Sequence, residues 1–177
     1  MKIKIKNEET VLIREATGAD AVKILDYIET ISGESDFLTF GLGEFTLSTA
    51  DEAKFLEHTA RQNNAIYLLA EINGKIVGTA NFSGGSRPRI AHVGEISVSV
   101  LKKYWGNGIG TALLKYIINW SKQSGVIRKL NLRVRSDNLA AIHVYKKLGF
   151  IEEGVTTRQF LIDGKFYDAL CMGYEVD

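Results

Sequence analysis

The sequence predicts one mixed α/β (α+β) domain in which helices cover both faces of a mostly antiparallel central sheet. Strand and helix patterns follow one another along the whole chain, in the order strand, two helices, three strands, helix, strand, helix, two strands. The unit over residues 92–135 has the length of a strand–helix–strand crossover, so its two strands are expected to be parallel. A chain of 177 residues suits a single domain spanning 1–177, with its core at about 11–175.

The first part of the chain predicts a short strand followed by two helices. The strand is expected over 11–16, and a helix over 17–33 follows because apolar residues recur at helical spacing. Thr17 is the expected N-cap of that helix, with Asp20 at the capping-box position. A loop then leads to a second helix over 48–63.

The rest of the chain alternates between the two-residue period of strands and the 3.6-residue period of helices. Asn73-Gly74 and Asp163-Gly164 are typical of hairpin turns, and Gly149 ends the last helix. The predicted elements are strands over 65–72, 75–82 and 92–100, a helix over 108–122, a strand over 129–135, a helix over 137–148, and two final strands that flank the second turn.

The composition is typical of a cytoplasmic globular protein. Hydrophobic residues make up 45% of the chain and charged residues 24%. Cys171 is the one cysteine, which excludes an intrachain disulfide and favours a reducing compartment. The sequence contains no apolar run long enough for a signal peptide or a transmembrane helix, so a cytoplasmic protein without a membrane partner is expected.

The charges are separated along the chain, although they sum to +1. Residues 8–71 hold thirteen acidic and four basic residues, whereas residues 96–136 hold eight basic residues and no acidic one. This pattern predicts an anionic ligand near the second segment and a cationic ligand near the first, with an ordinary solvated surface as the alternative. A nucleic-acid partner is not expected, because the basic segment lacks the aromatic interleaving of single-strand binders.

Three glycines alternate over residues 106–110, between a predicted strand and an amphipathic helix. Without Cβ atoms, backbone N–H groups at such a turn can converge on one point, where the helix N-terminus adds positive potential. The segment therefore predicts a phosphate site; the alternative is a tight turn that needs positive φ, which explains one or two of the glycines. A P-loop is excluded because no lysine follows Gly110, and a dinucleotide fingerprint because the third glycine comes one residue early.

Two motifs resemble the signatures of the GNAT superfamily of N-acetyltransferases. The segment Trp105-Gly-Asn-Gly-Ile-Gly110 is similar to the family's Gln/Arg-x-x-Gly-x-Gly/Ala motif before a helix, and it departs from that motif at Trp105. The second motif is Asn138-Leu-Ala-Ala-Ile-His-Val-Tyr145-Lys-Lys-Leu-Gly-Phe150. The resemblance covers residues 11–175, and the C-terminal end looks like the small-molecule and polyamine branches of the family.

The resemblance implies the GNAT fold and acetyl-CoA as co-substrate, with no metal. The pantetheine arm would pair with the strand backbone beside Val98, Ser99 and Val100. Apolar and polar residues alternate over 95–100 in agreement with this, although an ordinary half-exposed strand would alternate too. The pyrophosphate would lie on the amides of a turn made of Gly106, Asn107, Gly108, Ile109, Gly110 and Thr111.

Asn138 and Tyr145 are two helical turns apart and therefore share one helix face. The resemblance implies that Asn138 contacts acetyl-CoA and that Tyr145 lies near its sulfur. A phenol with a pKa near 10 can protonate the departing thiolate there. The alternatives are a helix N-cap for Asn138 and a core aromatic residue for Tyr145.

The reaction needs a neutral amine, and hence a base or a water chain that leads to one. Glu95 is the first candidate because it is the acid on the cofactor strand, where burial would raise its pKa; a surface or structural carboxylate is the alternative. His92 is the second candidate, whereas His143 lies on the wrong helix face. The glutamate that a protein-N-terminus branch of the family carries on the next strand is missing from residues 132–134.

The acceptor is expected to bind near the loop over 34–48. Glu34 and Asp36 beside Phe37 would suit an ammonium group, with an ordinary solvated loop as the alternative. Cys171 has no base near it in the sequence, so a covalent acetyl-enzyme is not expected.

Together these residues predict direct transfer of an acetyl group from acetyl-CoA to a primary amine of a small molecule. Acetylation of a protein N-terminus or lysine is one alternative, and a non-catalytic CoA-binding sensor module is another. A homodimer formed through the C-terminal strands is a further expectation.

Overall fold

The structure, a computed structural model, describes residues 1–6 and 8–177. In this part of the chain the strands form one sheet in the order β1-β2-β3-β4-β5-β6-β8-β7. Neighbouring strands are antiparallel, except β5 and β6, which are parallel. The strands are β1 (Lys2–Lys4), β2 (Thr10–Glu15), β3 (Ala65–Ile72), β4 (Lys75–Gly84), β5 (Val93–Val100), β6 (Lys129–Arg135), β7 (Ile151–Ile162) and β8 (Lys165–Glu175).

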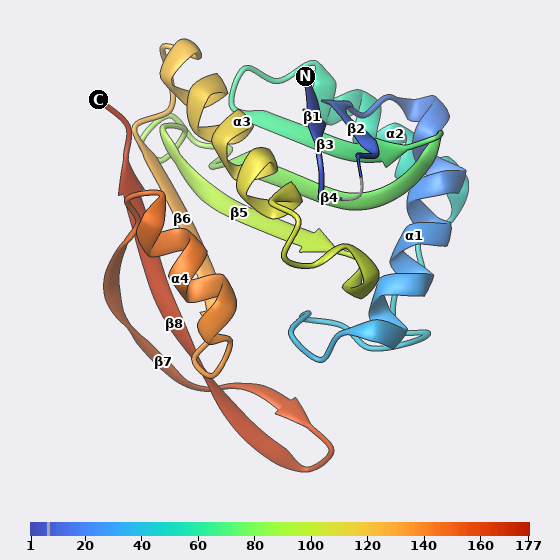
Figure 1. Ribbon diagram of the computed structural model, residues 1–177. Helices are drawn as coiled ribbons and strands as arrows, with labels where there is room; N and C mark the ends of the chain where they lie inside the picture. The colour runs from blue at the N-terminus through green and yellow to red at the C-terminus, as the bar shows by residue number, and fades with distance from the viewer. Residues whose placement is uncertain (7) are drawn as a thin grey trace.

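Helices cover both faces of this sheet (Figure 1). Leu69 of β3 faces α1 and α2, whereas Leu68 faces the layer of α3 and α4. All of β3 is buried between these two layers, which is typical of a central strand. The predicted mixed sheet, helix layers and parallel crossover are confirmed. The helices are α1 (Ala21–Glu34), α2 (Thr49–Ala60), α3 (Ile109–Gln123) and α4 (Leu139–Lys147), with short 3₁₀ turns η1 (Gly18–Asp20) and η2 (Lys102–Tyr104).

The N-terminal region differs from the prediction in two ways. β1 was not expected, because three residues carry too little pattern; it forms as an edge strand paired with β2. The helix predicted from Thr17 starts with η1, and α1 itself begins at Ala21. Thr17 and Asp20 form the expected capping box around that turn.

A charged cluster joins η1 to the sheet. Arg14 donates hydrogen bonds to both carboxylate oxygens of Asp20, at 2.7 and 2.8 Å, and to both of Glu71, at 2.9 Å each. Both carboxylates are nearly buried, with 8% of each side chain exposed. The hydrogen bonds from Arg14 lower the pKa of Asp20 to about 2, against the opposing effect of burial. The cluster therefore links β2 and β3 to the start of α1.

The variant Asp20→Asn is expected to lower the free energy of unfolding by about 2 kcal/mol at pH 7, because the depressed pKa of Asp20 measures how strongly the fold stabilises its charge. Since the folded-state pKa is below the unfolded-state value near 4, this contribution is present above pH 4 and is lost as the pH falls toward 2. Urea unfolding should therefore show a difference between variant and parent that shrinks between pH 7 and about pH 3. The control Arg61→Ala removes an exposed ion pair with Glu57 and should change stability by less than about 0.5 kcal/mol. A variant–parent difference that stays constant with pH would contradict the prediction.

Candidate active site

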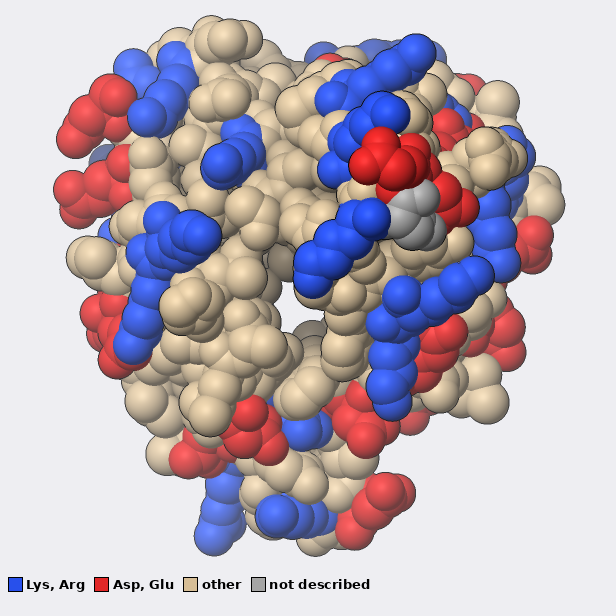
Figure 2. Space-filling view, in the orientation of Figure 1, with Lys and Arg blue, Asp and Glu red and all other residues tan. Residues whose placement is uncertain are grey.

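The parallel strands β5 and β6 separate along their length. Their pairing covers residues 93–95 of β5 and 129–131 of β6. Beyond this point β5 stays paired with β4, and β6 with β8. Among the described residues, no strand therefore pairs with the second edge of residues 96–100, in the middle of the sheet. In the orientation of Figure 1, the space-filling view shows an opening between the part that carries α4 and the part that carries α1 (Figure 2).

The chain leaves the open end of β5 through η2 and a glycine-rich turn that leads into α3. Gly106 and Gly108 have φ values of +71° and +81°, which residues with a Cβ rarely adopt. A Cβ at either position would meet no heavy atom within 4 Å, so the turn borders open space. Gly108 is the N-cap of α3 and has no side chain to cap it. Ala112 makes the first helical hydrogen bond, to the carbonyl of Gly108, so the amides of residues 109–111 point out of the helix end.

Two side chains hold this turn in place. The indole Nε1 of Trp105 donates to the carbonyl of Val100 at 2.6 Å, which ties the turn to the end of β5. The Nδ2 of Asn107 donates to the carbonyls of Tyr104 and Trp105 at 3.2 Å each. Gly110 lies inside α3 without a positive φ, and a Cβ there would be 3.8 Å from Val100. Positive φ therefore accounts for two of the three glycines.

Asn138 begins α4 at the same end of the sheet as the glycine turn, because β6 runs parallel to β5. Its Oδ1 accepts a hydrogen bond from the amide of Ala141 at 3.2 Å, so Asn138 caps the helix. Tyr145 is buried, and its ring packs edge-on against Phe150 with the centroids 5.9 Å apart. Burial raises the pKa of Tyr145 to about 12, and none of the described residues hydrogen-bonds its hydroxyl. The buried phenol is therefore a weaker acid than a free tyrosine.

The side chains of β5 alternate between the two faces of the sheet as predicted. Val98 and Val100 pack against the core that contains α3. Ser99 lies on the other face, where its Oγ is 2.9 Å from the hydroxyl of Tyr27 and 3.2 Å from that of Thr79. The open edge of β5 thus has an apolar side toward α3 and a hydroxyl cluster toward α1.

Glu95 lies at the surface, as in the alternative of a surface or structural carboxylate. Its side chain is 47% exposed, and Arg133 donates to its two carboxylate oxygens at 2.8 and 3.0 Å. The burial that would raise its pKa is not present, because α1 and α2 pack on β3 and β4. An amine would have to displace Arg133 in order to reach the carboxylate of Glu95.

The other reactive side chains lie apart from the glycine turn or face solvent. His92 precedes β5, about 25 Å from the turn at roughly 3.3 Å per strand residue. Its carbonyl accepts hydrogen bonds from the amides at 128 and 129. His143 is exposed on α4. Cys171 lies on β8, with its Sγ 3.4 Å from the hydroxyl of Thr156.

The three predicted acceptor residues anchor the loop after α1. Glu34 accepts a hydrogen bond from the amide of Lys102 at 2.8 Å, which joins the end of α1 to η2. The ring of Phe37 packs on the guanidinium of Arg135, 4.3 Å from the ring centroid. The carbonyl of Asp36 accepts a hydrogen bond from the same guanidinium at 3.0 Å. The loop therefore reaches from α1 to β6, across the gap that β5 and β6 leave open.

Arg135 and Asn131 are residues of this region that the sequence did not reveal. Arg135 is buried, lies 4.3 Å from the ring centroids of both Phe37 and Tyr167, and donates two hydrogen bonds to Asp137. Asn131 pairs in register with residue 95 just where the two strands separate, and its buried Oδ1 has no hydrogen-bond partner among the described residues. Neither residue belongs to a sequence motif, and the aromatic partners of Arg135 come from distant parts of the chain.

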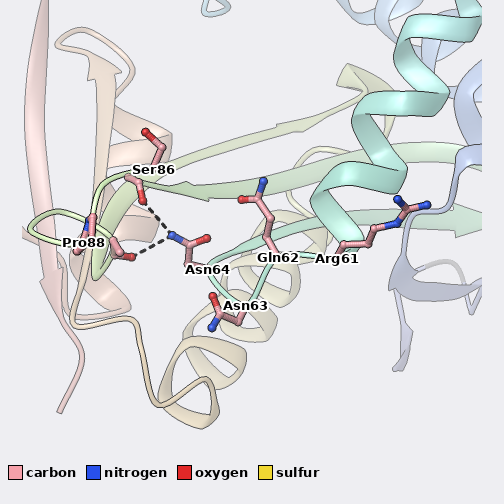
Figure 3. A pocket seen from close by; sticks show the side chains of 8 residues that line it. Arg61, Gln62, Asn63, Asn64, Ser86 and Pro88 are labelled. Atoms are coloured by element: carbon pink, nitrogen blue, oxygen red, sulfur yellow. Dashed lines mark hydrogen bonds between the residues drawn. The ribbon is translucent and has the colours of Figure 1, made fainter.

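A second hollow lies near the paired start of β5. It is an open pocket of about 600 Å³ between the end of α2 and the loop after β4 (Figure 3). The Nδ2 of Asn64 donates to the carbonyls of Gly85 and Ala91 at 3.1 Å each, which fixes that loop. The length of β5 separates this pocket from the glycine turn. Its lining includes Arg61, Gln62, Asn63, Asn64, Ser86 and Pro88.

None of the helices in residues 1–6 and 8–177 is long and apolar enough to cross a membrane. No group of three or more His, Cys, Asp or Glu side chains in this part of the chain could hold a metal ion.

Comparison with known proteins identifies the family. The sequence profile of the acetyltransferase (GNAT) family matches residues 32–150. A crystal structure of a GNAT-family acetyltransferase from Streptococcus pneumoniae superposes with a TM-score of 0.91 at 37% identity, covering 94% of this chain and 99% of that one. A putative acetyltransferase from Salmonella typhimurium, whose structure contains its cofactor acetyl-CoA, has a TM-score of 0.82 at 23% identity over 94% of each chain, which shows a shared fold.

Two curated relatives match a shorter segment. An L-amino acid N-acetyltransferase of Escherichia coli is 34% identical over 109 residues, which are 59% of this chain and 65% of that protein. An N-alpha-acetyltransferase of Sulfurisphaera tokodaii is 35% identical over 119 residues, 63% of this chain and 70% of that protein. The chain thus spans just under two thirds of the length of the first relative.

The matched profile and the shared fold define the class of protein as the GNAT acetyltransferases. The chain belongs to the acetyltransferase (GNAT) family.

Proposed function

We propose that the protein transfers an acetyl group from acetyl-CoA directly to a primary amine of a small molecule. The observation that carries this proposal is the unpaired edge of residues 96–100, which leads straight to the glycine turn at the N-terminus of α3. An extended thioester arm can form strand-like hydrogen bonds with such an edge. The diphosphate of the same molecule suits the outward amides and positive end of the helix.

The residues of the turn fit this donor. Gly106 and Gly108 leave space where side chains would otherwise stand, and the amides of residues 109–111 supply the donors. In this proposal, Val98, Ser99 and Val100 flank the arm, and Asn138 contacts it with the amide group that also caps α4. Tyr145 lies near the sulfur.

The loop after α1 favours a small acceptor over a protein chain. Arg135 holds this loop against β6 through Asp36 and Phe37, and Glu34 holds its start against η2. The loop therefore bounds the space beside the open edge of β5 on the side away from α3. The half-exposed carboxylate of Glu95 lies on the strand that carries this edge, and an ammonium group that displaced Arg133 could donate hydrogen bonds to it.

A panel of acceptors tests the proposal. Thiol release from acetyl-CoA would be measured with spermidine, L-phenylalanine and a short peptide with a free N-terminal alanine. We expect release with at least one of the two small amines and a kcat/KM at least tenfold lower with the peptide. Release with the peptide alone would favour acetylation of protein N-termini. Acetyl-CoA binding by calorimetry without release on any amine would favour a non-catalytic sensor.

We also propose that the protein is a homodimer that uses the C-terminal hairpin. β7 is the last strand of the sheet, and the β7–β8 hairpin projects beyond the body of the protein (Figure 1). It carries exposed apolar side chains at Ile151, Val155, Leu161 and Phe166, and an unprotected strand edge of this kind is a template for pairing. Sedimentation equilibrium should give a mass twice that of the monomer, which is 19.6 kDa.

A further inference from the structure

An exposed ion pair bridges β5 and β6 just past the point where the two strands separate. Backbone pairing of these strands ends at Glu95 and Asn131, which are register partners. Arg133 lies two residues further along β6, and its Nε and Nη2 donate to the two carboxylate oxygens of Glu95 at 2.8 and 3.0 Å. The ion pair therefore spans the start of the gap that the open edge of residues 96–100 borders.

Both side chains of this ion pair lie on the face of the sheet that points away from α3 and α4. Ile96 follows Glu95 in the chain, and Leu132 and Val134 flank Arg133; all three are buried in the core that contains residues of α3 and α4. Successive residues of a strand point to opposite faces, so the two charges lie on the other face. About half of each side chain is exposed there, so a molecule in solvent can reach both charges.

The proposed position of acetyl-CoA directs its acetyl group toward this ion pair. In the proposed function, the arm leaves the diphosphate at the glycine turn and runs along β5 from residue 100 to residue 96. This segment is about 16 Å long, at roughly 3.3 Å per strand residue. Glu95 is the next residue in that direction. An acceptor held by the ion pair would therefore lie toward the thioester end of the arm.

Arg133 is held less firmly than Arg135, the next residue of β6 on the same face. Arg135 is buried, lies between two aromatic rings and donates hydrogen bonds to Asp137. Arg133 is half-exposed, and its third nitrogen, Nη1, forms no hydrogen bond with any of the described residues. Exposed ion pairs are weak, so a charged ligand can exchange with either partner at little cost.

We propose that the acceptor is a small α-amino acid whose ammonium and carboxylate groups exchange with the two charges of this ion pair. This inference rests on the proposed function. The ammonium group takes the place of Arg133 on the carboxylate of Glu95, and the released guanidinium binds the carboxylate of the acceptor. Each charge keeps an opposite charge beside it, and a guanidinium can donate two parallel hydrogen bonds to a carboxylate. Arg133 thus determines which amines the site accepts.

The charges on β6 favour this acceptor over a polyamine. An amine without a carboxylate would leave the displaced Arg133 without a counter-ion. Two further basic residues, Lys129 and Arg135, alternate with apolar residues along the same strand and so share its face. Their ion-pair partners are Glu153 and Asp137, respectively. Additional ammonium groups of a polyamine would therefore be repelled along β6.

The test compares acceptors that differ only in the carboxylate group. L-phenylalanine, L-methionine and L-leucine are each compared with the corresponding amide and with the amine that lacks the carboxylate, and thiol release from acetyl-CoA is measured. Hydrogen bonds between charged groups are strong, so we expect at least one amino acid to have a kcat/KM about tenfold or more above both of its counterparts. Spermidine should be a poorer acceptor than that amino acid.

Arg133→Gln tests whether this residue recognises the carboxylate. It should raise KM for the preferred amino acid about tenfold and leave kcat nearly unchanged, because the contact is the same before and during the reaction. It should not raise KM for the amine that lacks the carboxylate. Arg133→Lys keeps the charge without the planar fork and should retain part of the preference. The matched control is Arg128→Gln, an exposed arginine just before β6 that donates to backbone carbonyls and should leave every KM unchanged.

A binding measurement gives a readout that does not depend on turnover. The preferred amino acid is titrated by calorimetry into the parent and into Arg133→Gln, each saturated with CoA. We expect the variant to bind the amino acid about tenfold more weakly and CoA as tightly as the parent. Because Arg133 lies at the surface, the variant should also unfold at the same temperature as the parent.

The outcomes separate failure of this inference from failure of the proposed function. If amines without a carboxylate are acetylated as well as the amino acids, or if Arg133→Gln affects all acceptors equally, the inference is overturned and the proposed function stands. If a peptide alone is acetylated, or if no amine releases thiol, the proposed function fails and this inference fails with it.

Discussion

Replacing Gly108 with valine should weaken acetyl-CoA binding about a hundredfold, which corresponds to a loss of roughly 2.7 kcal/mol. Gly108 has a φ of +81° and opens α3. A β-branched residue in this conformation is strained by about 1–2 kcal/mol, and its side chain would stand in the open space beside the outward amides. The variant thus changes the shape of the anion site and adds bulk where the diphosphate is proposed to lie.

A valine at Gly125 is the matched control for this experiment. Gly125 follows the other end of α3, has a φ of +68°, and likewise has no heavy atom within 4 Å of a built Cβ. Both variants should lose a similar amount of folding stability, about 1–2 kcal/mol, because the backbone strain is similar. Only the change at Gly108 should reduce the affinity for acetyl-CoA measured by calorimetry. Equal affinities for the two variants would show that the turn does not hold the diphosphate.

The sequence predicts the parts of the site that depend on local structure. The glycines at 106 and 108 signal a turn with positive φ, and the amphipathic helix after them indicates where a helix N-terminus must lie. Asn138 and Tyr145 are also predictable, because seven residues in a helix place two side chains on one face. These inferences need only the neighbouring residues, and the structure has the turn and both helices at the expected places.

The parts of the site that depend on contacts between distant segments are not predictable in this way. The separation of β5 from β6 follows from strand register, which a single sequence does not contain. Arg135 reads as an ordinary basic residue at the end of a strand, and it is buried against Phe37 and Tyr167, which come from distant parts of the chain. The surroundings of Glu95 depend on distant segments in the same way: its half-exposed side chain pairs with Arg133 of the neighbouring strand, which no local pattern reveals.

Replacing Tyr145 with phenylalanine should lower kcat by about 10²–10³-fold, the effect of removing one hydrogen-bond donor to charge that develops in a transition state. Burial raises the pKa of Tyr145 to about 12, whereas an ordinary thiol has a pKa near 8.5. Complete proton transfer from this phenol to a thiolate would be uphill by roughly 3–4 pKa units, or about 5 kcal/mol. We therefore expect Tyr145 to stabilise the departing thiolate as a hydrogen-bond donor, while the proton on sulfur comes from the amine.

The pH dependence of kcat and a control variant distinguish a Tyr145 that only donates a hydrogen bond from a Tyr145 that gives up its proton. The phenol stays protonated up to about pH 12, so the parent kcat should show no falling limb that belongs to Tyr145 between pH 7 and about pH 10. Tyr174→Phe is the matched control, because Tyr174 also packs against the Phe150 ring, with the centroids 5.4 Å apart. It removes one hydroxyl from the same aromatic cluster and should leave kcat unchanged. If both variants lose activity equally, the effect arises from packing around Phe150, and the hydroxyl of Tyr145 has no special part in the reaction.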